Sequence, residues 1–371
     1  MNHSIDQGTV VCIHEDRLSH LIGAKLAVLS LMHHCPDLPI VLSCPSPPAS
    51  LRHWVEGLKN VRLVSYPELR NLGWNVKPAV FLRLFEAGYS EIIWMDSDII
   101  ANGDILSKLL LYSAKILVLT QETYWGQEQS GNFRTLAWGF TLGRDLPCAL
   151  NTGIIRATTH HIQLIKAWQI MLNHPLYVHA QTLPWLERPV HMVGDQDALT
   201  ALMGGSEFAN TPISMLKRGE DIAQCVGPSG FTPIERLRSL STGLPPLIHA
   251  QGAKPWTKPS QPPTILNSQK PLLKSLREYY SYVSLELAPY ESVARQYQAG
   301  LEEDSTWMDI ESNLGKFIVG LAGNHPILRD FSLALFDAVT RRIRRYLKIA
   351  RYSVSPEFFL KESPLKQISS E

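Results

Sequence analysis

Residues 91–104 constrain the fold more than any other stretch, and they read EIIWMDSDIIANGD. An apolar run at residues 92–95 is followed at once by two carboxylates, Asp96 and Asp98, with one serine between them. This pattern predicts a buried strand that ends by presenting acids at the edge of a sheet. Carboxylates in apolar surroundings are costly unless a cation or hydrogen bonds compensate them. The pattern favours a divalent-cation site, and the alternative is a turn whose aspartates accept bonds from backbone amides.

The first two thirds of the chain alternate short apolar runs with segments of helical periodicity. The expected strands lie at residues 9–13, 39–44, 61–64, 91–95, 116–119 and 151–155. The expected helices lie at residues 21–34, 51–58, 79–87, 106–111, 160–172 and 193–203. This alternation predicts an α/β fold with a mostly parallel sheet flanked by helices. Ligands of such sheets bind beyond the carboxyl ends of the strands, where Asp96 and Asp98 fall.

Two regions break this alternation. Residues 121–147 show no period, and we expect an irregular segment there that lines an acceptor site. Beyond about residue 264 the pattern is that of helices without strands. The sequence therefore predicts an α/β domain at residues 1–263 and a helical C-terminal extension at residues 264–371.

Charge and cysteine content limit the partners and the location. The formal net charge is +1, so a polyanion such as nucleic acid is not expected as the main partner. The five cysteines form no CxxC pair, which argues against a zinc site and favours a reducing compartment. With no secretory-signal pattern and no apolar run of about 20 residues, we expect a cytoplasmic protein.

Three further stretches carry polar groups suited to a site. In HAQGAKPW at residues 249–256, His249 suits a metal such as Mn²⁺, Gly252 permits close backbone approach to a phosphate, and Lys254 offsets phosphate charge. The alternative is a solvated surface loop. Asp195 and Gln196 either begin a helix, with Asp195 as its cap, or lie beside a reacting sugar carbon. Asn151 opens NTG, which is either a turn or a reader of sugar hydroxyls.

In this order, the four stretches resemble retaining nucleotide-sugar glycosyltransferases of the GT-A fold. The chain is most similar to glycosyltransferase family 8, which includes glycogenin and bacterial lipopolysaccharide galactosyltransferases. MDSD matches the family's D-x-D motif, NTG its N-[AST]-G motif and DQDAL its D-Q-x-x-L motif. IHAQGAKPW is similar to H-x-x-G-x-x-K-P-W, with one residue fewer between glycine and lysine. The resemblance covers residues 9–256.

The resemblance implies transfer of a sugar from a nucleoside-diphosphate donor, UDP-linked, to a hydroxyl of a saccharide, lipid or protein, with retention of configuration. It implies that Asp98 and His249 bind Mn²⁺ or Mg²⁺, with Asp96 on the metal or on the ribose. Lys254 and Gly252 would hold the diphosphate. A further cation for the diphosphate would be Lys77, which we favour over Arg83. The groups facing the donor sugar would be Asp195, Gln196 and Asn151.

Other functions fit parts of the pattern. A nucleotidyltransferase also uses a metal on an α/β sheet, but it would carry a glycine-rich phosphate loop, and residues 9–25 contain only Gly23. A phosphatase with an aspartyl nucleophile also has a D-x-D motif, usually followed by Thr or Val rather than Ile99 and Ile100. A non-catalytic nucleotide-sugar-binding domain of the same fold would be stabilised by UDP and Mn²⁺ without turnover.

The extension contains one basic amphipathic segment, residues 330–352. Its apolar stripe consists of Phe331, Leu335, Val339, Ile343 and Leu347, and arginines and lysines crowd the same stretch. One interpretation is a helix that packs this stripe on the catalytic domain. The other is a peripheral contact with anionic lipid at the inner face of a membrane.

Overall fold

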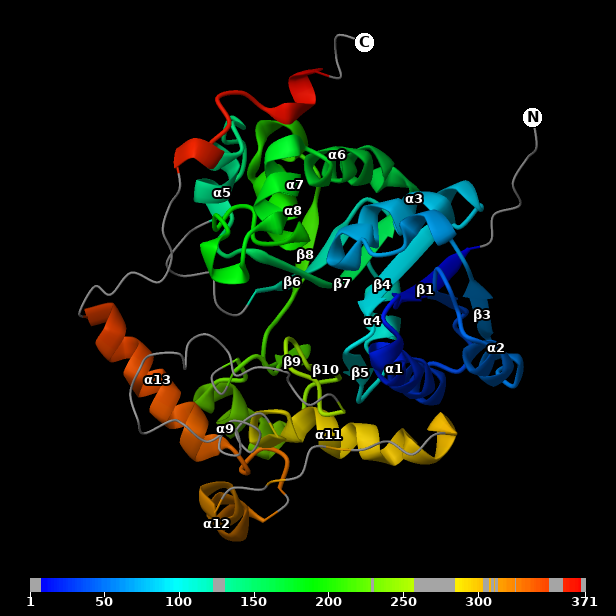
Figure 1. Cartoon of the computed structure of the whole chain (residues 1–371), viewed down its shortest axis with the longest axis vertical. Coiled ribbons are helices and arrows are strands. Elements are labelled where there is room, and N and C mark those ends of the chain that lie inside the picture. Colours follow the sequence, from blue (N-terminus) through cyan, green and yellow to red (C-terminus); the bar gives the residue numbers. More distant parts are fainter. Residues whose placement is uncertain are drawn as a thin grey trace.

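A mostly parallel sheet forms the centre of the structure (Figure 1). The computed structural model describes residues 8–122, 131–227, 230–256, 284–302, 307, 310, 313–323, 325–346 and 356–367. Within these ranges the central sheet has seven strands, which lie in the order β3 (Val61–Val64), β2 (Ile40–Ser43), β1 (Thr9–His14), β4 (Glu91–Asp96), β7 (Leu150–Thr158), β6 (Leu117–Gln121) and β8 (Ile213–Leu216). Neighbouring strands are parallel except at β7, which runs antiparallel to β4 and β6. The predicted α/β class is confirmed.

Helices cover both faces of this sheet. The helices α3 (Lys77–Glu86), α6 (Ile162–Leu172), α7 (Pro175–Thr182) and α8 (Asp195–Gly204) contribute to one core, and α1 (Leu21–His34), α2 (Ala49–Glu56) and α4 (Leu106–Leu110) contribute to the other. On β1, Val10 and Cys12 face the first core, whereas Val11 and Ile13 face the second. Because successive side chains of a strand point to opposite faces, a strand covered on both sides needs the continuous apolar run seen in the sequence.

A small second sheet connects the end of β4 to the segment that contains His249. It has the order β5 (Ile99–Ala101), β10 (Leu247–His249) and β9 (Ile222–Gln224). β5 follows the turn after β4 directly, and its antiparallel pairing with β10 sets His249 opposite Ile99. The Ala250 amide donates to the Asp98 carbonyl at 2.9 Å. This register places His249 beside the acidic turn although about 150 residues separate them in sequence.

The region expected to be irregular contains a helix, α5 (Gly131–Ala137), so that expectation is wrong for residues 131–137. Residues 123–130 lie outside the described ranges. α5 packs on α8, and Arg134 makes a buried ion pair of 2.7 Å with Asp197. The segment therefore belongs to the core around α8.

The C-terminal part is helical where it is described, with α11 (Ala288–Ala294), α12 (Asn313–Ala322) and α13 (Phe331–Tyr346). The predicted boundary at residues 263 and 264 lies outside the described ranges, and the division into two domains stays a prediction. Tyr290 and Leu287 of this part share a core with Leu26, Ile100 and Trp256. Among the helices that the structure describes, none has the length and apolar character needed to cross a bilayer.

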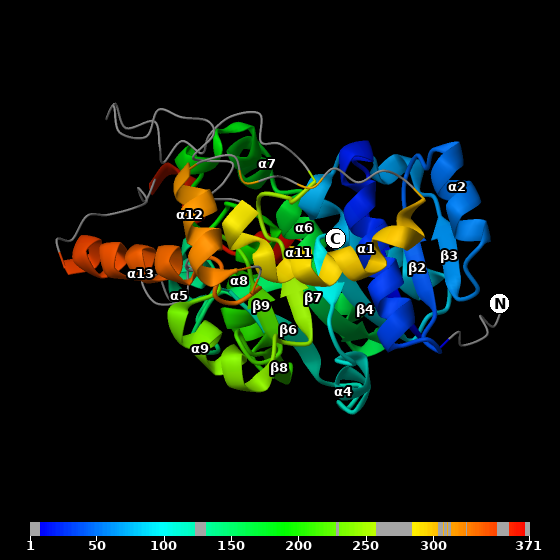
Figure 2. The same ribbon diagram turned by 90° about the horizontal axis from the view of Figure 1, so that it is seen from below.

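α13 turns its apolar stripe away from the protein. The exposed fraction is 49% for Leu335, 45% for Val339 and 54% for Ile343, whereas Ala334 is fully buried. α13 packs against α9 (Pro233–Thr242) and lies at the outer edge of the molecule in both views (Figures 1 and 2). For these three residues, the expectation that the stripe packs on the catalytic domain is wrong. Leu347 lies outside the described ranges.

Candidate active site

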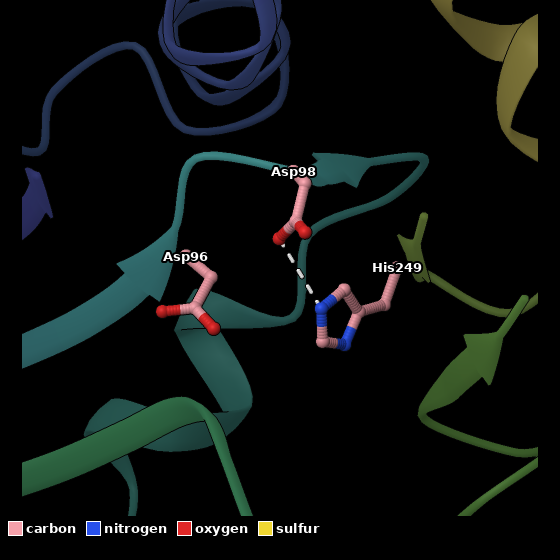
Figure 3. Close-up of side chains that lie close together, drawn as sticks. All are labelled: Asp96, Asp98 and His249. Atoms are coloured by element: carbon pink, nitrogen blue, oxygen red, sulfur yellow. Dashed lines mark ion pairs between the residues drawn. The ribbon is translucent and has the colours of Figure 1, made fainter. Parts of the chain in front are cut away.

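The two aspartates and the histidine come together at the carboxyl end of β4. One ligand atom from each of Asp96, Asp98 and His249 lies within 4.8 Å of the others (Figure 3). Asp96 is the last residue of β4, Asp98 lies in the turn that follows, and His249 ends β10. Two carboxylates and an imidazole are a suitable donor set for Mn²⁺, and the carboxylates also suit Mg²⁺. Hence the residues present fit a divalent cation.

Asp98 contacts both Lys254 and His249. The ammonium of Lys254 contacts its Oδ2, and His249 Nε2 lies 3.2 Å from its Oδ1. Burial alone would raise the pKa of the Asp98 carboxyl, but the charges of Lys254 and His249 outweigh burial and hold this pKa well below its usual range. Oδ1 itself accepts no hydrogen bond from the described residues, and the buried Nδ1 of His249 has no hydrogen-bond partner there either. Asp98 Oδ1 therefore keeps a lone pair for another group, and His249 Nδ1 keeps either a lone pair or a proton.

The loop after His249 has the backbone that its sequence predicted. Gly252 has φ +94°, a region that side chains other than glycine rarely adopt, and no atom lies within 4 Å of where a Cβ would stand. Lys254 is 6% exposed, and its ammonium donates to the Ala250 carbonyl at 2.6 Å as well as to Asp98. The shorter Gly–Lys spacing therefore still brings Lys254 into the acidic group. The contact of Gly252 and Lys254 with a diphosphate stays a prediction.

Lys77 bridges two carboxylates, those of Asp96 and Asp195. Its Nζ lies 3.1 Å from Asp96 Oδ1 and 3.3 Å from Asp195 Oδ2, and it donates to Thr152 Oγ1 at 2.9 Å. Lys77 is the first residue of α3 and is 3% exposed. The structure thus places Lys77 between the carboxylates of Asp96 and Asp195, and its contact with the diphosphate stays a prediction. Arg83 instead pairs with Glu68 and Glu86 at the surface.

Asp195 begins α8 but does not cap it. The Gly194 amide donates to Asp197 Oδ2 at 3.0 Å, so the capping carboxylate is Asp197. Asp195 Oδ2 instead accepts from Thr152 Oγ1 at 2.8 Å. Burial raises the pKa of Asp195 even though Lys77 is adjacent. The interpretation of Asp195 as a helix cap is wrong, and its carboxylate contacts Thr152 and Lys77 instead.

A glutamate that the sequence did not single out completes the polar group around the NTG motif. Glu122 Oε2 accepts from Asn151 Nδ2 at 2.9 Å and from Gln196 Nε2 at 2.8 Å. Glu122 is 3% exposed and directly follows β6. Its only sequence signal is that it ends an apolar strand, as Asp96 does. Asn151, Gln196 and Glu122 form one connected group of hydrogen-bonding side chains.

A pair of residues that the sequence did not single out, Glu15 and Arg17, supports the turn that holds Asp98. Glu15 follows β1 and accepts from Arg17 Nε at 2.8 Å, from Arg17 Nη2 at 2.9 Å and from Ser97 Oγ at 2.6 Å. Since Ser97 lies between the two aspartates, Glu15 fixes the position of their turn relative to β1. The carboxyl ends of the neighbouring strands β1 and β4 are therefore linked by the hydrogen bond between Ser97 and Glu15.

No family model and no curated protein sequence matches this chain. Among solved structures, the chain is similar to the apo structure of the bifunctional glycosyltransferase WbbM, at 13% identity and a TM-score of 0.47, over 69% of this chain and 48% of that one. It is similar to the galactosyltransferase LgtC, solved with donor and acceptor sugar analogues, at 15% identity and a TM-score of 0.45, over 79% and 100%. A third is the glycosyltransferase GlyE of Streptococcus pneumoniae, at 14% identity and a TM-score of 0.40, over 78% and 63%. The chain spans about half the length of WbbM, and all three similar structures are glycosyltransferases.

Proposed function

We propose that this protein is a metal-dependent glycosyltransferase that moves a sugar from a nucleoside-diphosphate donor, UDP-linked as the sequence resemblance implies, to a hydroxyl acceptor. The observation that supports it most is the cluster of Asp96, Asp98 and His249, whose ligand atoms lie within 4.8 Å of one another. Directly beside this cluster lies the second group, Asp195 with Thr152, joined to Asp96 through Lys77. A cation site and a polar sugar-facing group at one sheet edge are what such a transfer requires.

Asp98 and His249 would hold the cation, with Asp96 on the cation or on the donor ribose. A bound Mn²⁺ or Mg²⁺ supplies positive charge against the diphosphate leaving group. Asp98 Oδ1 lies 3.2 Å from His249 Nε2 but accepts no hydrogen bond from the described residues, so it keeps a lone pair for a cation, which supports this assignment. Lys254 already contacts Asp98, and its ammonium would supply further positive charge toward the diphosphate.

The donor sugar would lie beside the second group, Asp195 with Thr152. Loss of the diphosphate leaves positive charge at the anomeric carbon, as in glycoside hydrolysis. Asp195 lies within reach of that charge in our proposal, and Lys77 and Thr152 hold its carboxylate in place. Asn151, Gln196 and Glu122 would bind sugar hydroxyls through amide and carboxylate groups that already hydrogen-bond to one another. Retention of configuration is carried over from the resemblance.

Incubation of the protein with a panel of UDP- and GDP-hexoses and Mn²⁺ is expected to release the nucleoside diphosphate from at least one UDP-hexose. Water serves as the acceptor in this assay, so no acceptor has to be known. Release should stop when EDTA removes the cation and return when Mn²⁺ is restored. Thermal stabilisation by UDP and Mn²⁺ without release from any donor would instead favour the non-catalytic binding domain.

The stripe on α13 supports a location at the inner face of a membrane in the cytoplasm. Phe336 is 72% exposed and Tyr346 is 87% exposed, and they continue the outward stripe of Leu335, Val339 and Ile343. Exposed Arg342 flanks the stripe, and the sequence adds Arg341, Arg344 and Arg345 within the same helix. An exposed apolar stripe beside concentrated positive charge is typical of helices that lie in an anionic lipid interface.

The double variant Phe336→Asp with Ile343→Asp should reduce co-sedimentation with phosphatidylserine-containing vesicles by about tenfold or more, since two apolar side chains no longer enter the interface. Binding of the unmodified protein should weaken with salt and on pure phosphatidylcholine vesicles. Leu111→Asp is the matched control, because Leu111 is 86% exposed and lies on the α4 side of the molecule. Equal binding of the double variant would remove α13 as the contact. A dimer that the double variant dissociates would identify the stripe as a self-contact instead.

A further inference from the structure

Two exposed tryptophans lie close together outside the polar groups described above. Trp74 is 43% exposed and Trp185 is 48% exposed, and no other tryptophan of the described residues is exposed to this extent. Their rings meet edge to face, with centroids 5.8 Å apart. Large aromatic side chains left in contact with water often mark a binding surface. Neither residue has a role in the transfer reaction as proposed.

Arg188 packs against both tryptophan rings. The guanidinium of Arg188 lies 5.7 Å from the Trp74 ring centroid and 5.8 Å from that of Trp185. Arg188 in turn donates to Gln181 Oε1 at 2.7 Å and to the Val193 carbonyl at 3.1 Å. The Tyr177 hydroxyl donates to Oδ1 of Asn75, the residue after Trp74, at 2.7 Å. A surface fixed in this way loses little conformational entropy when a ligand binds.

The pair adjoins the sugar-facing group. Trp74 lies in the turn directly before Lys77, and a Cβ built on Gly194 would lie 3.7 Å from Trp74 Nε1. Gly194 is the residue before Asp195, so the indole edge of Trp74 covers the start of α8. The other end of the site is formed by Lys254 and His249 on Asp98. The aromatic surface is therefore on the Asp195 side of the site.

We infer that Trp74 and Trp185 form a stacking platform for a pyranose ring of a saccharide acceptor, which rests on the proposed glycosyl transfer. One face of a pyranose presents C–H groups that pack on an aromatic ring, while its hydroxyls at the rim stay hydrated or meet polar groups. Arg188 is engaged with backbone and amide oxygens, so the platform offers ring surface rather than a free charge to a ligand. Because the platform lies beside Asp195, the hydroxyl of an acceptor bound there would lie near the anomeric carbon of the donor sugar. A saccharide acceptor is thus favoured over a protein hydroxyl.

The test compares acceptor use with donor hydrolysis in Trp185→Ala and Trp74→Ala. With methyl glucosides, methyl galactosides, lactose and maltose as acceptors, KM for the acceptor should rise by about tenfold, the loss expected for one stacked ring. Release of UDP to water should stay within about twofold, because the donor side is unchanged. Trp185→Phe should keep most of the acceptor affinity. Leu111→Ala, at the exposed C-terminal end of α4, should behave as the unmodified protein.

Tryptophan fluorescence titrated with the same saccharides gives a second readout that needs no turnover. Quenching in the unmodified protein that is lost in Trp185→Ala would support the platform. If no donor is hydrolysed, the proposed function fails, and this titration alone decides the platform. Unchanged acceptor KM in both alanine variants, equal loss of hydrolysis and transfer, or absence of saccharide binding would each overturn it.

Discussion

Asp98→Asn is expected to lower cation-dependent release of UDP by about 10²- to 10³-fold or more, the loss typical of removing one charge-stabilising group from an active site. Asp98 is the shared contact of His249 and Lys254, so the change removes the central negative charge while keeping the shape of the side chain. The proposed cation would lose one of its ligands. kcat/KM for the UDP-hexose found in the donor panel, measured over a Mn²⁺ titration, checks the effect.

A loss of fold has to be separated from a loss of chemistry in this variant. Lys254 keeps its bond to the Ala250 carbonyl but loses its carboxylate, so the melting temperature of Asp98→Asn should be measured first. The rise in melting temperature caused by Mn²⁺ should disappear in the variant and remain in Asp37→Asn, whose carboxylate is exposed at the surface. Full turnover of Asp98→Asn with unchanged Mn²⁺ dependence would remove Asp98 from the site.

The elements with strong local patterns were predictable from the sequence. The helix at Leu21–His34 matches its predicted bounds, since its apolar spacing ends where Cys35 and Pro36 begin. β4 begins at Glu91 as expected, because a long apolar run next to polar residues leaves few alternatives. α5 was missed, since its seven residues include Gly131, Asn132 and Thr135, which are weak helix formers. α5 owes its place to packing on α8, which no local pattern reveals.

The site residues likewise divide into those that local sequence patterns reveal and those that only the fold brings together. Asp96 and Asp98 were recognisable because they interrupt an apolar run, and His249 because it ends one. Glu122 could not be assigned, since only the neighbouring position of β6 and β7 brings it to Asn151. The reversed direction of β7 is decisive here. A strand antiparallel to β4 places its first residues, Asn151 and Thr152, at the carboxyl end of β4. The sequence alternation indicated parallel strands and gave no sign of this reversal.

Lys77→Met is expected to destabilise the fold by about 3–5 kcal/mol near neutral pH, the cost of leaving a buried charge without its partner. Lys77 is the cation shared by Asp96 and the buried Asp195, and methionine keeps the length of the side chain without the charge. Burial already raises the pKa of Asp195, and loss of the ammonium removes the charge that opposes this rise. A carboxyl whose pKa is higher in the folded state binds its proton more readily there, so stability falls as pH rises through the folded pKa. The deficit relative to the unmodified protein should therefore be smaller at about pH 5 than at about pH 7.5, as measured by urea unfolding.

Lys108→Met is the matched control, because Lys108 is half exposed and its ion pair with Asp221 lies near the surface, so its loss should cost about 1 kcal/mol or less. Combining Lys77→Met with Asp195→Asn should restore part of the lost stability, since the second change removes one of the two unpaired carboxylates. The same double variant should remain inactive in UDP release, because Asp195 faces the site together with Thr152. Recovery of stability without recovery of activity would show that Lys77 holds a carboxylate that the reaction needs. A single variant as stable as the unmodified protein at about pH 7.5 would mean that Lys77 does not offset the charge of these carboxylates.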